Sequence, residues 1–412
     1  MERHVTIIGA GVIGMCAASY LQRAGRKVTV IDSVAPGDGC SFGNAGGLST
    51  GACVPLALPG VLKQVPKWLF DKEGPLVLRP GYLPKALPWL WKFVRASAPA
   101  QVEKSADGLH ALMNPLFDNY EPLLAEANAK DLFRRNGQLY VYSTQEAFEG
   151  DAFGRELRRS RGIPFDLMDG EELRQMEPNL KPIFKRAMFM PEHGNCMNPF
   201  RLVGVLADAF RRNGGDIVQG RVTDVEIGDA GAQALQTQGG THKVDDLVIT
   251  AGAWSHRLAQ KFGHKVPLET QRGYHVTLPN AGASPQRGVM WAEKRFLTTP
   301  MEMGVRVAGT VEIAGLDAEP DYRRADMLVK QAGEMWSGFD GANGTKWMGH
   351  RPCLPDSLPV IDRSSKVNNV YFAFGHGHVG LSCASTTGRL LSELVTGANT
   401  CIDPGLYRID RF

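Results

Sequence analysis

Residues 4–32, HVTIIGAGVIGMCAASYLQRAGRKVTVID, constrain the fold of this chain more than any other stretch. They read as an apolar strand, a glycine turn, a helix and a second strand, with Gly9, Gly11 and Gly14 in the spacing G-x-G-x-x-G. Gly9 allows a tight turn, Gly11 lets the backbone approach a pyrophosphate, and Gly14 lets the helix pack closely on the strand. The N-terminus of the helix offers unpaired N–H groups and partial positive charge to phosphates. This unit predicts a doubly wound α/β core that binds a nucleotide.

Asp32 closes this unit, 18 residues after Gly14 and at the end of the second strand. A carboxylate at this place can bind the hydroxyls of a ribose. Strand, turn, helix and acid together predict a bound dinucleotide, whereas the simpler interpretation is a glycine-rich turn used only for packing. NAD and FAD sites share this unit, so the unit alone does not decide between them.

A second strand–turn–helix unit near the other end of the chain favours FAD. A strand is expected at 370–374 and a helix from about 380 to 395, joined by GHGHVG at 375–380. A helix N-terminus favours the negative charge that a reduced flavin carries at its N1–C2=O edge, and nicotinamide has no such charge to hold. The alternative is an ordinary strand–helix turn. Such a turn would account for one glycine, and it accounts less well for three glycines that alternate with histidines.

Central segments extend the same domain. A helix is expected from Asn198-Pro199, an N-cap with proline after it, to Arg212, and two strands follow it. Ala251 and Gly252 come directly after the second of these strands, where backbone can lie against a cofactor. The nucleotide domain is therefore predicted to be discontinuous, with segments 1–95, 190–258 and 346–412.

The remaining segments, 96–189 and 259–345, are expected to form a second domain. Strands are predicted at 137–144 and 272–278, and a hairpin at 295–315 with its turn at Met303-Gly304. We predict an α/β protein, α+β when the whole chain is considered: a Rossmann-like FAD-binding domain with an inserted, mostly antiparallel β substrate domain. The reactive end of the cofactor would lie at their interface.

Composition excludes several other classes of protein. Charged residues make up 22% of the chain and the net charge is +3, and no stripe of interleaved basic and aromatic residues predicts binding to nucleic acid. The seven cysteines contain no C-x-x-C pair, so neither a zinc site nor a disulfide framework is expected, and no other metal site is predicted. The N-terminus lacks the pattern of a signal peptide, and no run of 18 apolar residues could span a bilayer. A cytoplasmic protein with reduced thiols is expected.

Segment 54–95 is unusual. It contains Trp68, Trp89 and Trp91 among many leucines and prolines, and seven Lys or Arg against two acids. Aromatic rings beside cations suit a membrane interface, which makes the segment a candidate membrane-facing excursion. The protein would then lie peripherally on the inner face of the cytoplasmic membrane. The alternative is a proline-broken excursion that packs on the main body.

Six motifs, in this order, resemble the FAD-dependent D-amino-acid oxidase and glycine oxidase superfamily. They are GAGVIG, SFGNAGGLS, AGAWS, RGYH, RPxxPDxxPVI and FGHGHVGLS. The likeness runs from end to end and is greatest to the bacterial D-amino-acid dehydrogenases of the small subunit type. It implies non-covalent FAD, because Gly349 stands near the place where covalently flavinylated relatives carry a cysteine.

The resemblance assigns residues to the parts of FAD. The first motif would hold the pyrophosphate, Asp32 and Ser33 the adenosine ribose, and the backbone of Val222 the adenine. Segment 41–47 would lie along the flavin, and 376–382 would wrap its pyrimidine edge. Together with Ala251, Gly252 and the glycine turns, the candidate cofactor residues are Gly9, Gly11, Val12, Ile13, Gly14, Asp32, Ser33, Ser41, Asn44, Ala45, Gly46, Gly47, Val222, Ala251, Gly252, Gly375, His376, Gly377, His378, Val379, Gly380, Leu381 and Ser382.

The stretch GHRPCLPDSLPVID, residues 349–362, holds one guanidinium in a segment stiffened by three prolines. Because each proline fixes its φ angle, we expect a rigid, irregular loop. The resemblance makes Arg351 the arginine that binds the substrate carboxylate, since a guanidinium grips a carboxylate with two hydrogen bonds and fixes its plane. The alternative is a structural ion pair between Arg351 and Asp356.

Tyr274 is expected to be a second substrate contact. Phe296 or Leu297 stands near the position at which relatives often carry a tyrosine. An apolar residue at this position would not make the polar contact with the substrate that a tyrosine hydroxyl makes. The histidines of the motifs are expected to be structural, because oxidation of a neutral amine needs no protein base.

The resemblance implies oxidative deamination of D-amino acids, with hydride passing from Cα to flavin N5 and the imino acid hydrolysed to a 2-oxo acid and ammonia. Electrons would pass to a quinone or another non-oxygen acceptor. One alternative is a narrow relative, such as a cis-4-hydroxy-D-proline dehydrogenase or a glycine or sarcosine oxidase. A flavin-binding subunit without amine chemistry is another. An NAD-dependent dehydrogenase is disfavoured by the C-terminal glycine turn, because its nucleotide domain would be complete within about 150 residues.

Overall fold

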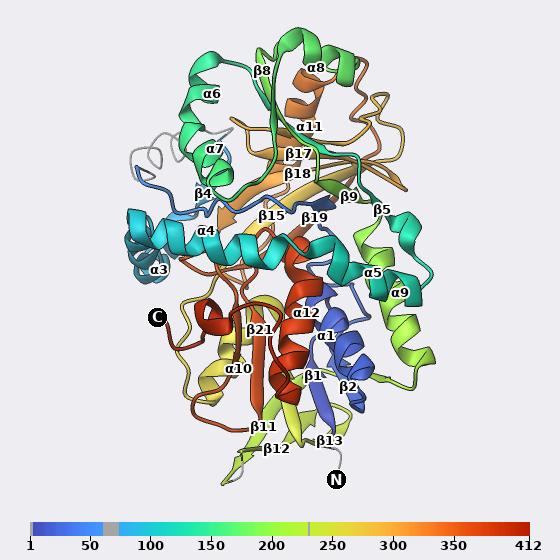
Figure 1. Ribbon diagram of the computed structural model, residues 1–412, viewed down its shortest axis with the longest axis vertical. Coiled ribbons are helices and arrows are strands. Elements are labelled where there is room, and N and C mark those ends of the chain that lie inside the picture. Colours follow the sequence, from blue (N-terminus) through green and yellow to red (C-terminus); the bar gives the residue numbers. More distant parts are fainter. Residues whose placement is uncertain (1–2, 61–73, 230) are drawn as a thin grey trace.

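The computed structural model describes residues 3–60, 74–229 and 231–412. In these ranges the chain forms two large sheets, one in the lower and one in the upper half of Figure 1. The lower sheet is mostly parallel and the upper sheet mostly antiparallel. The predicted combination of a Rossmann-like unit with a mostly antiparallel sheet is therefore confirmed.

The lower sheet is built from the beginning, middle and end of the chain. Its strands lie in the order β10 (Asp216–Gln219), β2 (Val28–Asp32), β1 (Val5–Ile8), β14 (Asp246–Ile249), β21 (Val370–Phe374) and β20 (Val360–Arg363). Neighbours pair in parallel except β20, which is antiparallel to β21. The carboxyl ends of the parallel strands therefore meet at one edge, where ligands of such sheets bind.

Both faces of this sheet are covered, as a parallel sheet requires. One face packs against α1 (Val12–Arg23), α9 (Pro199–Arg212) and α12 (Gly380–Thr396). The other face packs against α10 (Ser255–Lys261) and the antiparallel strands β11 (Val222–Gly228), β12 (Gly231–Thr237) and β13 (Gly240–Lys243). Ile7 of β1 belongs to the core with α1, α9 and α12, and Ile8 belongs to the core on the other face, because successive side chains of a strand point to opposite faces.

Two more helices join the core of α1 and α12. They are α4 (Pro99–Met113) and α5 (Leu116–Glu126), and they cross the middle of Figure 1. Tyr120 of α5 donates its hydroxyl hydrogen to the Leu381 carbonyl at 2.9 Å, and the Asn119 amide donates to Thr386 Oγ1 at 3.0 Å. These helices fall in the segment that the sequence allotted to the substrate domain, although they pack on the nucleotide-type sheet.

The upper sheet has nine strands. Its path is β19 (Thr345–Cys353), β15 (Glu269–Leu278), β18 (Gly304–Ile313), β17 (Phe296–Met301), β16 (Gly288–Trp291), β6 (Gln138–Tyr142), β8 (Arg186–Met190) and β7 (Asp166–Asp169), with β4 (Leu76–Leu78) paired to β18. The predicted strands at 137–144 and 272–278 and the predicted hairpin at 295–315 are all present, and Met301 pairs with Gly304 across the hairpin turn. Helix α11 (Arg323–Met335) buries its apolar side chains in the core of this sheet.

Shorter elements complete the described chain. A small sheet has the order β3 (Gly47–Leu48), β9 (Gly194–Cys196) and β5 (Phe133–Arg134). The remaining helices are α3 (Leu83–Ala96), α6 (Gln145–Gly150), α7 (Ala152–Arg159), α8 (Gly170–Met176) and the 3₁₀ turns η1 (Pro80–Tyr82), η2 (Lys130–Leu132), η3 (Gly252–Trp254) and η4 (Pro404–Tyr407).

Arg351 does not lie on an irregular loop, so that prediction is wrong. Strand β19 runs through Arg351 and Pro352 to Cys353 and pairs with β15 along its length. It is the first strand in the order of the upper sheet, and proline is tolerated at such an edge because one side needs no ladder donor. The segment boundaries of the two domains stay a prediction. Strand β19 belongs to the upper sheet, whereas nearly all of it lies in segment 346–412, which the sequence assigned to the FAD-binding domain.

The described part of the predicted excursion comprises residues 54–60 and 74–95. One side of it packs against the rest of the protein. Strand β4 pairs with β18, and the Trp89 indole of α3 donates to the Cys353 carbonyl at 3.2 Å. The other side of α3 exposes apolar side chains. Residues 61–73, with Trp68, lie outside the described residues. Within the described ranges, no helix has the length and apolar character needed to cross a bilayer.

Candidate active site

A cavity of about 960 Å³ opens where the carboxyl edge of the lower sheet faces the upper sheet. This is near the upper end of the sizes found for small-molecule sites. Strands β1, β2, β14 and β21 reach it from below, and β15, β17, β18 and β19 reach it from above. The cavity therefore lies at the interface at which the sequence predicted the cofactor.

The first glycine turn forms part of the wall of this cavity. Gly9 has φ +112°, a conformation that favours glycine, and a Cβ there would lie 2.5 Å from the Thr250 carbonyl oxygen. A Cβ on Gly11 would meet only Ser41 Oγ, at 3.4 Å, so the space over Gly11 is open. Gly11 is the N-cap of α1 and places no side chain on the helix end. The turn is thus a cradle in which backbone N–H groups can face phosphates.

Gly14 lies in the first turn of α1, where the helix packs against the glycine turn. A Cβ on Gly14 would collide with the carbonyl oxygen of Gly9, so its absence lets α1 sit directly on the turn. Gly14 does not line the cavity, and neither does Gly46, whose Cβ would lie 2.7 Å from the Cys196 carbonyl oxygen. All the other predicted cofactor residues line the cavity.

Asp32 stands at the end of β2, where a ribose was predicted. Its Oδ2 accepts a hydrogen bond from the Ala10 N–H at 2.6 Å, and its Oδ1 accepts from the Val34 N–H at 3.3 Å. These bonds fix the carboxylate at the rim of the glycine turn. Ser33 and Val222 line the same end of the cavity.

The second glycine turn forms another part of the wall. Gly375 and Gly377 have φ of 88° and 53°, and α12 begins at Gly380 without a side-chain cap. The Gly377 N–H donates to the Pro352 carbonyl at 2.8 Å, and Cys353 forms an isolated β-bridge with His376. The turn that leads into α12 is therefore bonded directly to the strand that carries Arg351.

The histidines of this turn are neutral and held by partners. Burial lowers the pKa of His376 to about 3, and His376 Nε2 lies 3.0 Å from Thr387 Oγ1. Burial, followed by repulsion from Arg351 and Arg295, lowers the pKa of His378 well below its ordinary value. His378 Nε2–H donates to Gln271 Oε1 at 2.9 Å. Both imidazoles are thus placed as structural groups rather than as bases.

Arg351 lies at the cavity wall with its guanidinium fixed from one side. It donates to the carbonyls of Thr310 at 2.7 Å and Gly309 at 3.3 Å. Consecutive carbonyls of a regular strand point in opposite directions, but a β-bulge opposite Gly273 and the φ of 55° at Thr310 turn both toward Arg351. A positive φ is strained for a β-branched residue, and such strain often marks a functional position.

The charge of Arg351 is not neutralised by a side chain of the described residues. No carboxylate of the described residues forms an ion pair with Arg351, and Asp356 pairs with Arg411 at 2.8 Å instead. The alternative of an ion pair between Arg351 and Asp356 is therefore wrong. Two of five guanidinium N–H groups are used by the carbonyls, and the others are available to a ligand.

Gly273 of β15 makes room for this guanidinium. A Cβ on Gly273 would collide with the guanidinium carbon of Arg351. We expect Gly273→Ala to displace Arg351 and to lower kcat/KM about 100-fold, since small misplacements of a positioning group cost this much. FAD content should stay that of the wild type. Steady-state kinetics and the flavin absorbance of the purified variant check both points, and unchanged kinetics would contradict the assigned role of Gly273.

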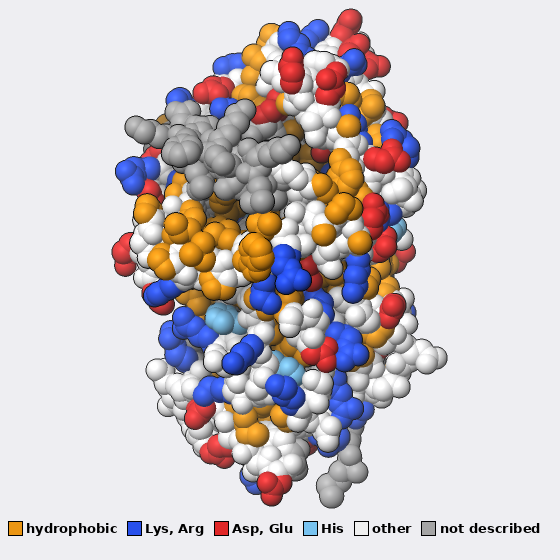
Figure 2. Space-filling model, turned by 90° about the vertical axis from the view of Figure 1, so that its left-hand side faces the viewer, with side chains coloured by type: hydrophobic (Ala, Val, Ile, Leu, Met, Phe, Trp, Pro, Cys, Tyr) orange, Lys and Arg blue, Asp and Glu red, His pale blue; other side chains and the backbone are white. Residues whose placement is uncertain are grey.

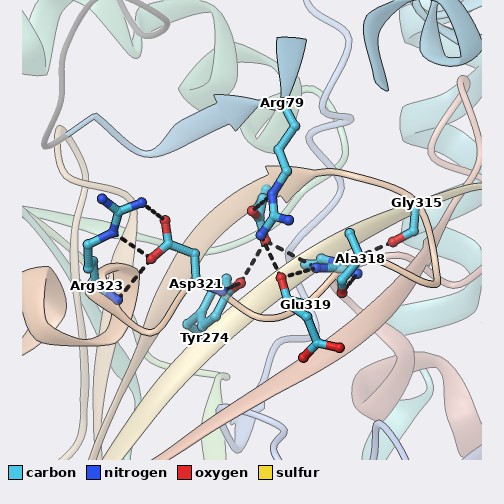
Figure 3. Close-up of polar contacts among 9 residues, drawn as sticks. Arg79, Tyr274, Gly315, Ala318, Glu319, Asp321 and Arg323 are labelled. Atoms are coloured by element: carbon cyan, nitrogen blue, oxygen red, sulfur yellow. Dashed lines mark hydrogen bonds and ion pairs between the residues drawn. The ribbon is translucent and has the colours of Figure 1, made fainter. Parts of the chain in front are cut away.

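Tyr274 lines the cavity, but its hydroxyl belongs to a buried polar network (Figure 3). The hydroxyl donates to Glu312 Oε2 at 2.6 Å and accepts from the Asp321 N–H at 2.9 Å. Burial, followed by the bond to Glu312, raises the pKa of Tyr274 to about 12. Arg79 also donates to Glu312, at 2.6 Å. Since this hydroxyl anchors the loop that contains Asp321, we do not propose it as a substrate contact.

Sequence reasoning missed several residues that line the cavity. Trp347 of β19 stacks on His275 with ring centroids 5.1 Å apart, and a Cβ on Gly43 would collide with its indole. Arg295 comes from the turn before β17 and directly precedes Phe296, whose position had drawn attention. Cys40, which follows the first βαβ unit, also lines the cavity. No local sequence pattern marks Gly43 and Gly273 as the glycines that make room for Trp347 and Arg351, because these side chains are distant along the chain.

The cavity fits FAD on its own geometry. Two helices, α1 and α12, begin at the cavity, neither N-cap residue provides a side-chain hydrogen bond, and the open space over Gly11 is what a pyrophosphate requires. Gly9 to Ile13 would hold the phosphates, Asp32 the ribose, and the turn at 375–382 the flavin edge.

Comparisons with known proteins agree with this geometry. The model of the FAD dependent oxidoreductase family, DAO, matches residues 4–394. A D-amino-acid oxidase of Bradyrhizobium diazoefficiens is 37% identical, with 100% of this chain and 99% of the relative covered. A D-amino acid dehydrogenase of Allorhizobium ampelinum is 30% identical, with 99% and 98% covered.

Solved structures show the same fold. A glycine oxidase of Geobacillus kaustophilus has a TM-score of 0.73 at 22% identity, with 100% of this chain and 99% of the other covered. An L-proline dehydrogenase of P. horikoshii has a TM-score of 0.76 at 19% identity, with 100% and 98% covered. By its sequence over nearly its whole length, this chain belongs to the DAO family of FAD-dependent oxidoreductases.

Proposed function

We propose that this protein catalyses the oxidative deamination of D-amino acids and that Arg351 holds the α-carboxylate of the substrate. The observation that carries the proposal is the Arg351 guanidinium, which faces the cavity without a carboxylate partner among the described residues. Its strand is bonded to the glycine turn before α12, through the Pro352 carbonyl and the Gly377 N–H. A carboxylate held by Arg351 would therefore be placed at a constant distance from the flavin end of the cavity.

The chain has little chemistry to perform beyond orientation. FAD, when bound, supplies a two-electron acceptor beside the substrate. The substrate loses two electrons and two protons as its Cα–N bond becomes a double bond, and water then converts the imino acid to a 2-oxo acid and ammonia. Arg351 fixes the plane of the carboxylate, and holding reactants in one geometry accounts for much of the rate of such reactions. The neutral His376 and His378 add no positive charge that would compete for the carboxylate.

The two curated relatives are named as an oxidase and as a dehydrogenase, so the electron acceptor needs a direct test. We propose a quinone or another non-oxygen acceptor. Purified protein should be assayed with D- and L-amino acids, glycine, sarcosine and cis-4-hydroxy-D-proline, once with a redox dye under argon and once with oxygen alone. We expect turnover of D-amino acids, faster with the dye. Turnover of glycine, sarcosine or hydroxyproline alone would show a narrow relative, and rapid hydrogen peroxide formation would show an oxidase.

We further propose that FAD is bound without a covalent bond. Gly349 lies in the cavity near the place expected of a flavin-linked cysteine, and Cys40 is the cysteine that lines the cavity among the described residues. Burial raises the pKa of the Cys40 thiol, which disfavours the reactive thiolate. Acid precipitation should release all the flavin into the supernatant. Flavin that stays with the protein pellet, and is lost from it in Cys40→Ala, would contradict the proposal.

The exposed side of α3 is the proposed contact with the inner face of the cytoplasmic membrane. Leu83, Leu87 and Trp91 follow each other at four-residue intervals on one side of the helix, and Trp91 is 65% exposed. Figure 2 shows the hydrophobic surface on this side of the molecule. Lys85 and Lys92 are exposed on the same helix and suit anionic headgroups.

Exchanging apolar side chains of α3 for serine should weaken binding to lipid. We expect the wild type to float with vesicles of phosphatidylglycerol and phosphatidylethanolamine, and Leu87→Ser/Trp91→Ser to lose at least about tenfold in affinity, from the apolar area withdrawn from the bilayer. Phe153→Ser is a matched control, because Phe153 is 42% exposed and belongs to α7 and not to α3. Equal flotation of wild type and double variant would refute the contact.

A further inference from the structure

We propose that the side-chain amide of Gln138 donates a hydrogen bond to the flavin ring of bound FAD, and that His193 holds the amide in the orientation this requires. Gln138 begins β6 and lines the cavity, and neither residue lies in the six sequence motifs. The inference goes beyond the proposed function, because it rests on FAD in the cavity and not on the identity of the amine that is oxidised.

The hydrogen bonds of His193 decide which end of the Gln138 amide faces the cavity. The Gly51 N–H donates to His193 Nε2 at 3.0 Å, so this nitrogen carries no hydrogen and Nδ1 is the protonated one. His193 Nδ1 lies 3.2 Å from the amide of Gln138, and because Nδ1 must donate, the atom that it meets is the oxygen Oε1. Burial, followed by repulsion from Arg158, lowers the pKa of His193 to about 3, so the ring stays neutral. The amide nitrogen Nε2 therefore points away from His193.

This amide nitrogen is a donor without an acceptor in the described part of the chain. Gln138 is 2% exposed and His193 is 1% exposed. No atom of the described residues accepts a hydrogen bond from Gln138 Nε2, and Nε2 is not fully enclosed by protein, so it is open to the cavity that Gln138 lines. Two glycines leave room beside it, since a Cβ on Gly47 would lie 3.2 Å from Nε2 and a Cβ on Gly288 would lie 3.0 Å from it. Buried donors are nearly always paired, which indicates that a ligand supplies the acceptor.

The place of the amide in the cavity favours the flavin as this ligand. Ser49 Oγ donates to Gln138 Oε1 at 3.4 Å, and the Ser49 N–H donates to Ser382 Oγ at 3.0 Å. Ser382 belongs to the first turn of α12, in the segment expected to wrap the pyrimidine edge of the flavin. Gly47, which lies against Nε2, ends the segment expected to lie along the ring. Gln138 is thus joined to both segments through which the flavin would be held.

The carboxylate site at Arg351 lies elsewhere on the upper sheet. Gln138 is on β6 and Arg351 is on β19, and four strands, β15, β18, β17 and β16, lie between them in the order of the sheet. Neighbouring strands are about 4.8 Å apart, so the interval along the sheet is longer than a small amino acid. This favours the larger ligand, FAD, over an amino acid held by Arg351 as the partner of the amide.

The reduction potential of the bound flavin tests this inference. Reduction makes the ring richer in electrons, so a fixed N–H donor stabilises the reduced ring more than the oxidised one. Gln138→Met keeps an unbranched side chain and removes the N–H groups. We expect the ratio of reduced to oxidised flavin at a given potential to fall about tenfold, which for a two-electron couple is a potential lower by about 30 mV. Titration with reductant beside a reference dye measures the shift. Gln145→Met, at an exposed position of α6 outside the cavity lining, is the matched control and should leave the potential unchanged.

A second variant keeps the inference testable if Gln138→Met does not fold. In Gln138→Met/His193→Phe both partners are apolar, so the imidazole N–H is not left buried without an acceptor. Its potential should fall as far as that of Gln138→Met, because the two residues act through one hydrogen bond and their effects are not additive. His193→Phe alone should lower the potential by less, since the donor remains but loses the partner that orients it.

Folded, FAD-loaded variants of Gln138 with the potential of the wild type would overturn the role of the amide. A raised KM at an unchanged potential would assign the amide to the substrate and would overturn the inference as well. Both results leave the proposed deamination standing. Failure of every amino acid to reduce the wild-type flavin would instead refute the proposed function, and the potentials of the variants would still decide the role of Gln138.

Discussion

Replacing Arg351 by lysine should raise KM steeply and lower kcat/KM for substrate amino acids by at least about 100-fold, while the variant folds and keeps its FAD. Removing one partner of a buried, hydrogen-bonded charge pair costs about 2–5 kcal/mol, and each 1.4 kcal/mol is a factor of ten. Lysine keeps the charge but not the planar fork. It cannot bond the Thr310 and Gly309 carbonyls and a carboxylate in one plane, as Arg351 can.

The control for this variant is Arg363→Lys. Arg363 lies on β20, is exposed and does not line the cavity. It should show wild-type kinetics. Flavin absorbance and thermal unfolding of both variants establish that they are folded and loaded. An Arg351→Lys variant with unchanged KM would remove Arg351 from the substrate site.

Gly11→Ala should lose FAD without losing the fold. The added Cβ would meet only Ser41 Oγ, at 3.4 Å, so the protein itself can accommodate it. The methyl group would, however, occupy the space that a pyrophosphate needs over the helix end. Overpacking of this kind costs about 3 kcal/mol, which corresponds to an affinity for FAD about 100-fold lower. Titration of the apoprotein with FAD measures the loss.

Substitutions at two further glycines serve as comparisons for Gly11→Ala. In Gly14→Ala the Cβ would collide with the Gly9 carbonyl, so α1 would have to move and we expect little folded protein. In Gly204→Ala, within α9, nothing lies within 4 Å of the new Cβ, and FAD binding should be unchanged. If Gly11→Ala bound FAD as tightly as Gly204→Ala does, the glycine turn would not be the phosphate site.

The nucleotide half of the fold could be predicted from the sequence because its signals are local. The spacing of Gly9, Gly11 and Gly14 after the strand Val5–Ile8 specifies strand, turn and helix, and the structure has each of them in place. The same holds for the turn at 375–380 before α12. Glycines in such turns are required by backbone geometry, which the sequence records directly.

The surroundings of Arg351 could not be predicted in this way. Three prolines indicated a loop, whereas pairing with β15 holds residues 345–353 in a strand at the edge of a sheet. The bulge at Thr310 that turns two carbonyls to one guanidinium depends on strands that are far apart in sequence. The hydroxyl of Tyr274 is likewise engaged by Glu312, 38 residues away. Tertiary contacts of this kind override local propensity.

The most direct test of the central claim is the absorbance of the purified, yellow protein before and after addition of a D-amino acid in the absence of oxygen. Oxidation of the substrate's Cα–N bond requires the flavin to take up two electrons, so its absorbance near 450 nm, roughly the maximum of oxidised flavins, should disappear within one turnover. The L-enantiomer should leave it unchanged, and Arg351→Lys should bleach far more slowly at the same concentration. Protein that is yellow but is bleached by no amino acid would contradict the assignment of amine oxidation to this site.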